Sequence, residues 1–215
     1  ITVTGNTLFL NVLFIAATTI TSVAIAIMLA EISNKWVKKI TQSIVILPHF
    51  MSWTIVSMLS VAILSANGVV NQLITMVGGK TIEFYNTPSV WPAILVILKV
   101  WQGAGFGSIV YLATITGIDA SIYEAAAVDG ASKTQCIFKV TLPMLKNTII
   151  MLTIMSVGKI FNGDFGMIYA MVGSNSILYP TTDVIDTYLF RQLLENPSMG
   201  QTAAVGLIQS ILGFG

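Results

Sequence analysis

Long apolar runs separated by short polar segments organise the 215-residue chain. A helix needs about 20 mostly apolar residues to cross a bilayer. We expect spanning helices at about Thr7–Leu29, Ser43–Leu64, Trp91–Ile115, Asn147–Val172 and Met199–Gly215. Pro48 interrupts the second run and predicts a kink that neighbouring helices tolerate. The pattern therefore predicts an all-α fold, a polytopic transmembrane helical bundle.

The two ends of the chain bear on how many helices the whole protein has. Residue 1 is an isoleucine rather than a methionine, and Gly215 falls within an apolar run. We therefore expect a single transmembrane domain over residues 1–215 that is truncated at both ends, with further helices beyond either one.

Charge is scarce, and its scarcity separates this chain from soluble proteins. Hydrophobic residues make up 55% of the sequence and charged residues only 9%, whereas soluble domains contain about 25% charged residues. A surface this poor in charge fits a lipid bilayer, and the formal net charge of +1 does not favour nucleic acid. One cysteine, Cys136, and one histidine, His49, are too few for a disulfide or a structural metal site.

The basic residues indicate which loops share a side of the membrane. Segments 32–41 and 116–146 hold Lys35, Lys38, Lys39, Lys133, Lys139 and Lys146, whereas the opposite loops hold Lys80 and Arg191. Loops rich in lysine and arginine usually face the cytoplasm. Two spans separate the two basic segments, which also puts them on one side. We therefore expect segment 116–146 to be cytoplasmic.

Segment 116–146 is the most polar part of the chain. Ser121 followed by Glu124 matches a capping box and predicts a helix start. Gly130 suits the left-handed residue that commonly ends a helix. A second short helix is expected from about Lys133 to Val140, stopped by Leu142-Pro143. The sequence therefore predicts two short helices at an angle to each other.

The spacing within this segment is specific. Glu124, Ala125 and Ala126 are followed after three residues by Gly130, and after nine more residues by Val140-Thr141-Leu142-Pro143. This arrangement resembles the EAA motif of binding-protein-dependent ABC transporter permeases, in which an Ile stands at the place of Val140. The resemblance implies the fold of a type I ABC importer permease. It also implies a coupling element that docks on a separate ATPase through Glu124, Ala125, Ala126, Asp129, Gly130, Leu142 and Pro143.

Other stretches extend the resemblance to the carbohydrate-import branch of this family, namely 47–50, 101–111 and 183–188. The resemblance implies the import of a sugar or oligosaccharide delivered by an external solute-binding protein. It implies a second permease subunit, which we expect to differ from this one, and a dimer of ATPase subunits that binds ATP and Mg²⁺. The chain itself would then bind no cofactor, catalyse no reaction, and lie in the bacterial cytoplasmic membrane.

Polar residues inside the third and fourth runs suggest a substrate path, because charges at membrane depth usually face a cavity or a partner. In the sugar-importing relatives, the helices on either side of the EAA loop line that path. The candidates are Lys99, Gln102 and Phe106 in the third run and Ser156, Lys159 and Asn162 in the fourth. Two lysines facing the cavity would favour an acidic oligosaccharide. Alternatively, either lysine pairs with Asp164, snorkels or lies in a subunit interface.

Other residues of the spans are interpreted as packing residues. His49 is expected to pack through a hydrogen bond, with a gating or substrate role as the alternative. Gly103, Gly105 and Gly107 are expected to let helices approach closely.

An ion-coupled secondary transporter is the alternative function. Such proteins usually contain internal repeats, and the two halves of this chain show no convincing repeat. Gly79-Lys80-Thr81 resembles the end of a phosphate-binding loop, but Ile74 stands where a glycine is needed. Ser156 to Lys159 matches Ser-x-x-Lys without its companion motifs. The sequence predicts no enzyme active site.

Overall fold

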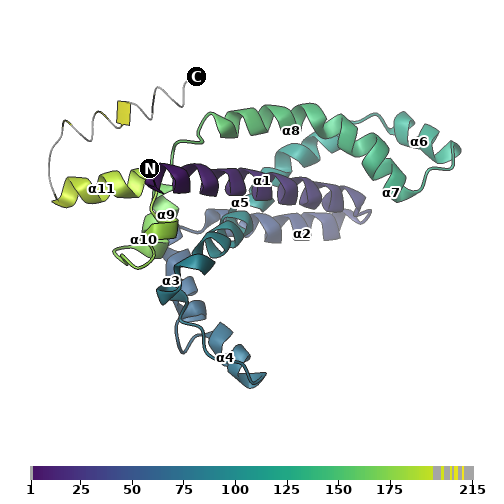
Figure 1. Ribbon diagram of the computed structural model, residues 1–215. Helices are drawn as coiled ribbons and strands as arrows, with labels where there is room; N and C mark the ends of the chain where they lie inside the picture. Colours follow the sequence, from purple (N-terminus) through teal and green to yellow (C-terminus); the bar gives the residue numbers. More distant parts are fainter. Residues whose placement is uncertain (1, 196–199, 201–203, 205, 208–209, 211–215) are drawn as a thin grey trace. The chain divides into compact units, whose positions relative to one another are not determined.

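The computed structural model describes residues 2–195, 200, 204, 206–207 and 210 (Figure 1). In this part of the chain all regular structure is helical, which confirms the all-α prediction. The expected run at Met199–Gly215 lies largely outside the described residues. The main helices are α1 (Thr2–Glu31), α2 (Lys35–Ile46), α3 (Trp53–Leu64), α4 (Val69–Met76), α5 (Trp91–Thr116), α6 (Ala120–Val128), α8 (Leu142–Val157), α9 (Phe165–Val172) and α11 (Ile185–Glu195).

Short helical turns join these helices. They are the 3₁₀ turns η1 (Leu47–Phe50), η2 (Phe84–Asn86) and η3 (Pro88–Val90), the short α-helices α7 (Lys133–Cys136) and α10 (Tyr179–Thr182), and the π-helical turn η4 (Ile137–Thr141).

Four helical stretches of the described residues are long and apolar enough to cross a membrane: Thr2–Glu31, Trp53–Met76, Pro88–Thr116 and Lys133–Val157. The first and third contain the predicted runs at 7–29 and 91–115. The structure thus agrees with a multi-pass membrane protein, and it differs from the prediction in the second and fourth runs.

The second run is not one kinked helix over 43–64. Helix α2 ends at Ile46, the 3₁₀ turn η1 follows, and a new helix, α3, begins at Trp53. Pro48 lacks the N–H that a continuing helix would need. Ser52 then caps α3, since its hydroxyl accepts a hydrogen bond from the Ile55 N–H at 3.4 Å. Proline and a new N-cap together break the helix.

The fourth run is not one helix over 147–172 either. Helix α8 ends at Val157 and α9 begins at Phe165, so residues 158–164 form a non-helical segment between them. The Asp164 carboxylate accepts a hydrogen bond from the Met167 N–H at 3.2 Å and caps α9. We call residues 158–164 the polar break.

The described residues fall into two compact units. The first draws on segments within Ile1–Phe14, Met51–Leu98 and Gly158–Gly215, and the second consists of Ile15–Phe50 and Lys99–Val157. Helices α1 and α5 contribute residues to both units. The assignment of residues 1–215 to one permease domain stays a prediction.

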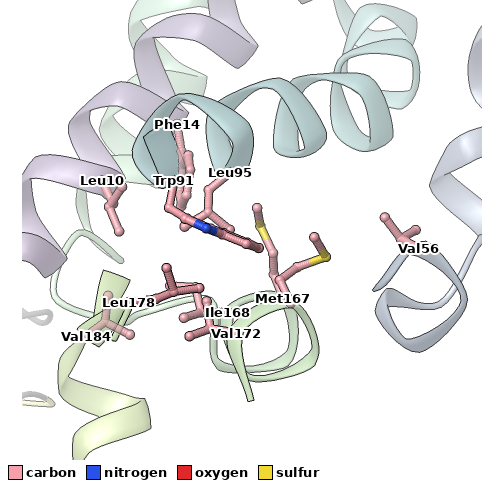
Figure 2. Packing of buried hydrophobic residues seen from close by; sticks show 11 residues of the cluster. Leu10, Phe14, Val56, Trp91, Leu95, Met167, Ile168, Val172, Leu178 and Val184 are labelled. Carbon is pink, nitrogen blue, oxygen red and sulfur yellow. The ribbon is translucent and has the colours of Figure 1, made fainter. Parts of the chain in front are cut away.

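The first unit has a core built around the fully buried Trp91 (Figure 2). Leu95 of α5 and Met167 and Ile168 of α9 surround it, and Leu178 also contributes a fully buried side chain. The Trp91 indole N–H donates to the Phe84 carbonyl at 2.8 Å. The buried polar end of this large side chain therefore has a partner.

The second unit is packed through small residues. The Ser22 hydroxyl of α1 donates to the Ala104 carbonyl of α5 at 3.0 Å. A Cβ on Gly107 would lie 2.7 Å from the Ser22 hydroxyl oxygen, and one on Gly105 would overlap the Val45 backbone. Larger residues at Gly105 and Gly107 would force these helices apart, which supports the packing interpretation of these two glycines.

Candidate functional site

The first helix of the loop 116–146 is α6, and its cap is Asp119. The Asp119 carboxylate accepts a hydrogen bond from the Ser121 N–H at 2.9 Å, which lowers the pKa of Asp119 below its usual value. The predicted capping box of Ser121 and Glu124 is wrong, because an aspartate two residues earlier starts the helix and puts Ser121 in its first turn. Glu124 is exposed on the helix surface.

Gly130 ends α6 as the sequence predicts. Its φ of +77° lies in the left-handed region, which glycine adopts without steric cost. The Gly130 N–H donates to the Ala127 carbonyl at 3.1 Å, and the Ala131 N–H donates to the Ala126 carbonyl at 2.9 Å. These bonds satisfy the last carbonyls of the helix and turn the chain sharply.

The second part of the loop does not end at Leu142-Pro143 as predicted. Ser132 and Gln135 form a reciprocal capping box that starts α7. The π-helical turn η4 follows and leads directly into α8, giving one helical stretch from Lys133 to Val157. Pro143 stands in the first turn of α8, where the missing proline N–H is accommodated beside an irregular turn. The loop is therefore continuous with a candidate membrane span.

A hydroxyl pair joins the two parts of the loop. The Tyr123 hydroxyl of α6 lies 2.9 Å from the hydroxyl of Thr141 in η4, and Thr141 is buried. Both residues line a cavity of about 290 Å³ together with Lys38, Glu31 and Thr116. The segments 32–41 and 116–146 therefore meet within the second unit, as expected for two loops on one side of a membrane.

The loop carries exposed apolar side chains among polar ones. Val128 is 88% exposed and Phe138 is 63% exposed. Of the predicted coupling residues, Glu124, Ala125, Asp129, Gly130 and Pro143 are exposed, and Ala126 and Leu142 are half-buried. A small apolar surface bordered by charged groups is typical of a docking site.

The candidate path residues on α5 lie on one uninterrupted helix. Lys99 and Gln102 are half-buried and Phe106 is exposed. The Phe106 ring stacks on the His49 ring, with 4.1 Å between centroids and 7° between planes, and Phe50 meets His49 edge-on. His49 therefore makes a packing contact, and that contact is aromatic rather than the hydrogen bond we expected.

The candidate path residues of the fourth run do not share one helix face, because the helix ends between them. Ser156 lies in the last turn of α8 and belongs to the second unit. Lys159 and Asn162 lie in the polar break and belong to the first unit. All three side chains are exposed.

The sequence interpretation missed an ion pair in the first unit. The Arg191 guanidinium contacts the Asp183 carboxylate at 2.6 Å and lies over the Tyr179 ring at 4.1 Å. The hydrogen bond to Asp183 raises the pKa of Arg191. These residues line a cavity of about 330 Å³ with Tyr169 and Phe190. The pairing is hard to find from the sequence, because Asp183 precedes α11 and nothing local indicates that its carboxylate turns back towards Arg191.

The membrane-spanning helices and the exposed loop define a membrane permease of the type I ABC transporter fold. The chain belongs to the family described as "Binding-protein-dependent transport system inner membrane component", whose pattern matches residues 22–214. This result confirms the resemblance predicted from the EAA loop.

The relatives include two proteins of Bacillus subtilis (strain 168). The chain is 32% identical over 209 residues to the polygalacturonan/rhamnogalacturonan transport system permease protein YteP, covering 97% of this chain and 64% of that protein. It is 32% identical over 190 residues to Protein LplB, covering 88% of this chain and 59% of LplB. The chain thus spans about six-tenths of the length of these two relatives.

Solved structures show the same fold. One is a bacterial alginate ABC transporter in complex with an alginate pentasaccharide-bound periplasmic protein, with a TM-score of 0.92 and 34% identity over 99% of this chain and 74% of that one. Another is a bacterial ABC transporter involved in the import of the acidic polysaccharide alginate, with a TM-score of 0.93, 34% identity and the same coverage. The predicted fold class is therefore confirmed.

Proposed function

We propose that the chain is a permease subunit of an ATP-driven importer and that the loop 116–146 couples it to a separate ATPase. The observation that carries this proposal is the exposed motif around Glu124 and Gly130, on a loop that continues into the span ending at Val157. A continuous helix transmits a displacement along its axis. A force applied to α6 and α7 would therefore reach α8.

The remaining partners follow from the same proposal. An ATPase dimer binds ATP and Mg²⁺, an external solute-binding protein delivers the solute, and a second, different permease subunit completes the path through the bacterial cytoplasmic membrane. The lysines of segments 32–41 and 116–146 support a cytoplasmic position for the loop. The shared cavity that Lys38 and Tyr123 line supports a position of both segments on the same side.

The coupling role is tested by Glu124→Ala and Gly130→Ala, alone and together. The matched control is the pair Glu83→Ala and Gly78→Ala, since Glu83 is also exposed and Gly78 also has a positive φ, of +81°, with open space around it. We expect the loop variants to lose ATPase co-purification and uptake while the control keeps both. Normal assembly and uptake in the double loop variant would contradict the proposal. Uptake without any ATPase would favour an ion-coupled transporter.

We also propose that the solute is an acidic oligosaccharide that contacts Lys99, Gln102, Phe106, Ser156, Lys159 and Asn162. The names of relatives and of solved structures supply support, since YteP is described for polygalacturonan and rhamnogalacturonan and the transporters for alginate. A lysine ammonium in a low-dielectric path attracts a uronate carboxylate strongly.

Competition between an acidic and a neutral oligosaccharide of equal length tests the choice of solute. Uptake by the whole complex should favour the acidic solute, and Lys99→Gln and Lys159→Gln should reduce that preference. Lys80→Gln is the control, because Lys80 is an exposed lysine outside the proposed path. A preference for the neutral solute would exclude the acidic one.

A further inference from the structure

The polar break leaves backbone groups without helical partners. Between α8 and α9 the chain is non-helical over residues 158–164. In a membrane protein each unsatisfied backbone group costs several kcal/mol, so such segments persist only where other groups satisfy them. The structure supplies these groups from both sides of the break within the first unit.

Asn11 of α1 holds one side of the break. Its amide nitrogen donates to the carbonyl of Ile160 at 2.9 Å and to that of Asn162 at 3.2 Å, and it also lies 3.0 Å from the Thr7 carbonyl of its own helix. The partners in these two bonds are separated by 149 and 151 positions in the sequence. A short side chain with two N–H donors is suited to bridge two nearby carbonyls.

Asp186 of α11 holds the other side. Its carboxylate accepts a hydrogen bond from the Gly163 N–H. The backbone of Gly163 also lies against α11 and the residue before it. A Cβ at that position would be 2.5 Å from a methyl group of Val184 and 2.7 Å from an Asp186 carboxylate oxygen. Only glycine allows this approach.

We propose that Asn11 and Asp186 are positioning residues that fix the polar break and with it the exposed side chains of Lys159 and Asn162. The role of Lys159 and Asn162 rests on the proposed function. The positioning of the break by Asn11 and Asp186 rests on the hydrogen bonds at Ile160, Asn162 and Gly163. A solute meets these two side chains in a defined place because the backbone under them is held by α1 on one side and α11 on the other.

Thiol labelling tests whether Asn11 holds the polar break in place, and it needs no transport assay. In the whole complex carrying Cys136→Ser and Ile160→Cys, a membrane-impermeant maleimide reports how freely the break moves, because the side chain of residue 160 is half-buried while the break is held. Asn11→Ala should raise the labelling rate at least about fivefold, because one lost hydrogen bond is worth about that factor and Asn11 donates two to the break. Asn6→Ala is the matched control, since Asn6 also lies on α1 and bonds to the distant carbonyls of Pro180 and Asp183 at 3.1 and 3.2 Å. An unchanged rate in Asn11→Ala overturns the proposal.

Selectivity separates the positioning role from general stability. Asn11→Ala and Asp186→Ala should reduce the preference for an acidic over a neutral oligosaccharide, with the amount of assembled complex unchanged. Asp186→Asn keeps an oxygen that can accept the Gly163 N–H and should restore most of the preference. Equal losses in Asp186→Asn and Asp186→Ala would contradict the hydrogen-bond role of Asp186.

The proposed function is tested on its own by Asn162→Ala and Lys159→Gln, assayed with Asn11 and Asp186 intact. Normal uptake and selectivity in both variants would remove Lys159 and Asn162 from the solute path. The labelling experiment would still decide whether Asn11 holds the break, so the two failures are distinguishable.

Discussion

The loop 116–146 and the segment 158–195 both consist of short helices and turns, but they are held in different ways. The loop is shaped by contacts between near neighbours in the sequence, such as the Asp119 cap and the capping box of Ser132 and Gln135. The segment 158–195 is held by partners far away in the sequence. Thr7 accepts the Ile185 N–H across 178 positions, and Asn175 donates to Tyr85 across 90.

The two regions also differ in which apolar side chains they expose. The loop keeps side chains such as Val128 and Phe138 exposed, whereas the other segment buries Met167, Leu178 and Asp183. A loop that folds by local contacts can present its surface to a partner without depending on the rest of the chain. A segment held by long-range bonds is fixed in place, so its exposed side chains, such as Lys159 and Asn162, keep defined positions. This difference fits a docking element in the first case and a solute-facing frame in the second.

The largest expected effect concerns a partly buried ion pair within the segment 158–195. Arg191→Ala leaves the buried Asp183 carboxylate without its ion-pair partner. We expect the free energy of unfolding to fall by about 2–3 kcal/mol, somewhat below the loss for a fully buried pair, because the Arg191 side chain is 23% exposed. Thermal unfolding of the purified complex measures the loss. Lys133→Ala in the loop is the control, and an equal loss there would contradict the comparison.

A pair of glycine substitutions sharpens the comparison. Gly163→Ala places a methyl group against Val184 and Asp186, and overpacking of this kind costs about 1–3 kcal/mol. Gly130→Ala meets open space, so its cost is only the left-handed backbone, about 1–2 kcal/mol. We expect Gly163→Ala to lower the melting temperature more and Gly130→Ala to lower ATPase co-purification more. The opposite ranking would show that the two regions do not divide stability and docking as proposed.

Two tyrosines test whether the hydroxyl pair of the loop matters. Tyr123→Phe removes a bond to the buried Thr141 hydroxyl and should cost about 1 kcal/mol. Tyr85→Phe is the matched control, because burial raises the pKa of Tyr85 and its hydroxyl has no hydrogen-bond partner among the described residues. Its removal should be neutral or stabilising. Thermal melting measures both variants. A loss of stability in Tyr85→Phe as large as that in Tyr123→Phe would contradict the stabilising role of the Tyr123 hydroxyl.

The smallest expected effect is a pH dependence at the start of α6. The hydrogen bond from the Ser121 N–H lowers the pKa of Asp119 below its ordinary value near 3.8. The cap therefore contributes fully above that pH and is lost as the pH falls through the lowered value. Asp119→Asn keeps the cap without a titrating group. Amide hydrogen exchange in α6 should differ between the unmodified protein and Asp119→Asn only below about pH 3.8. A difference between them at pH 6 would point to another cause.

The sequence determined the features that depend on composition and on neighbours along the chain. Scarce charge and long apolar runs predicted a helical membrane protein, and the spacing from Glu124 to Pro143 predicted the family. Gly130 was predicted to end α6 because a positive φ is a local property of the backbone. The helix start was placed wrongly, since two nearby residues, Asp119 and Ser121, could each cap it.

Tertiary structure decided what depends on partners distant in the sequence. Apolar residues flank residues 158–164 on both sides, so the sequence predicts one helix through them. In the structure, Asn11 and Asp186 instead bond to backbone groups of this stretch that a helix would have satisfied internally. The stacking of Phe106 on His49 is of the same kind. The physical reason is that hydrogen bonds and ring contacts compensate for a broken helix only after the chain has brought distant residues together, and no local pattern records which residues will meet.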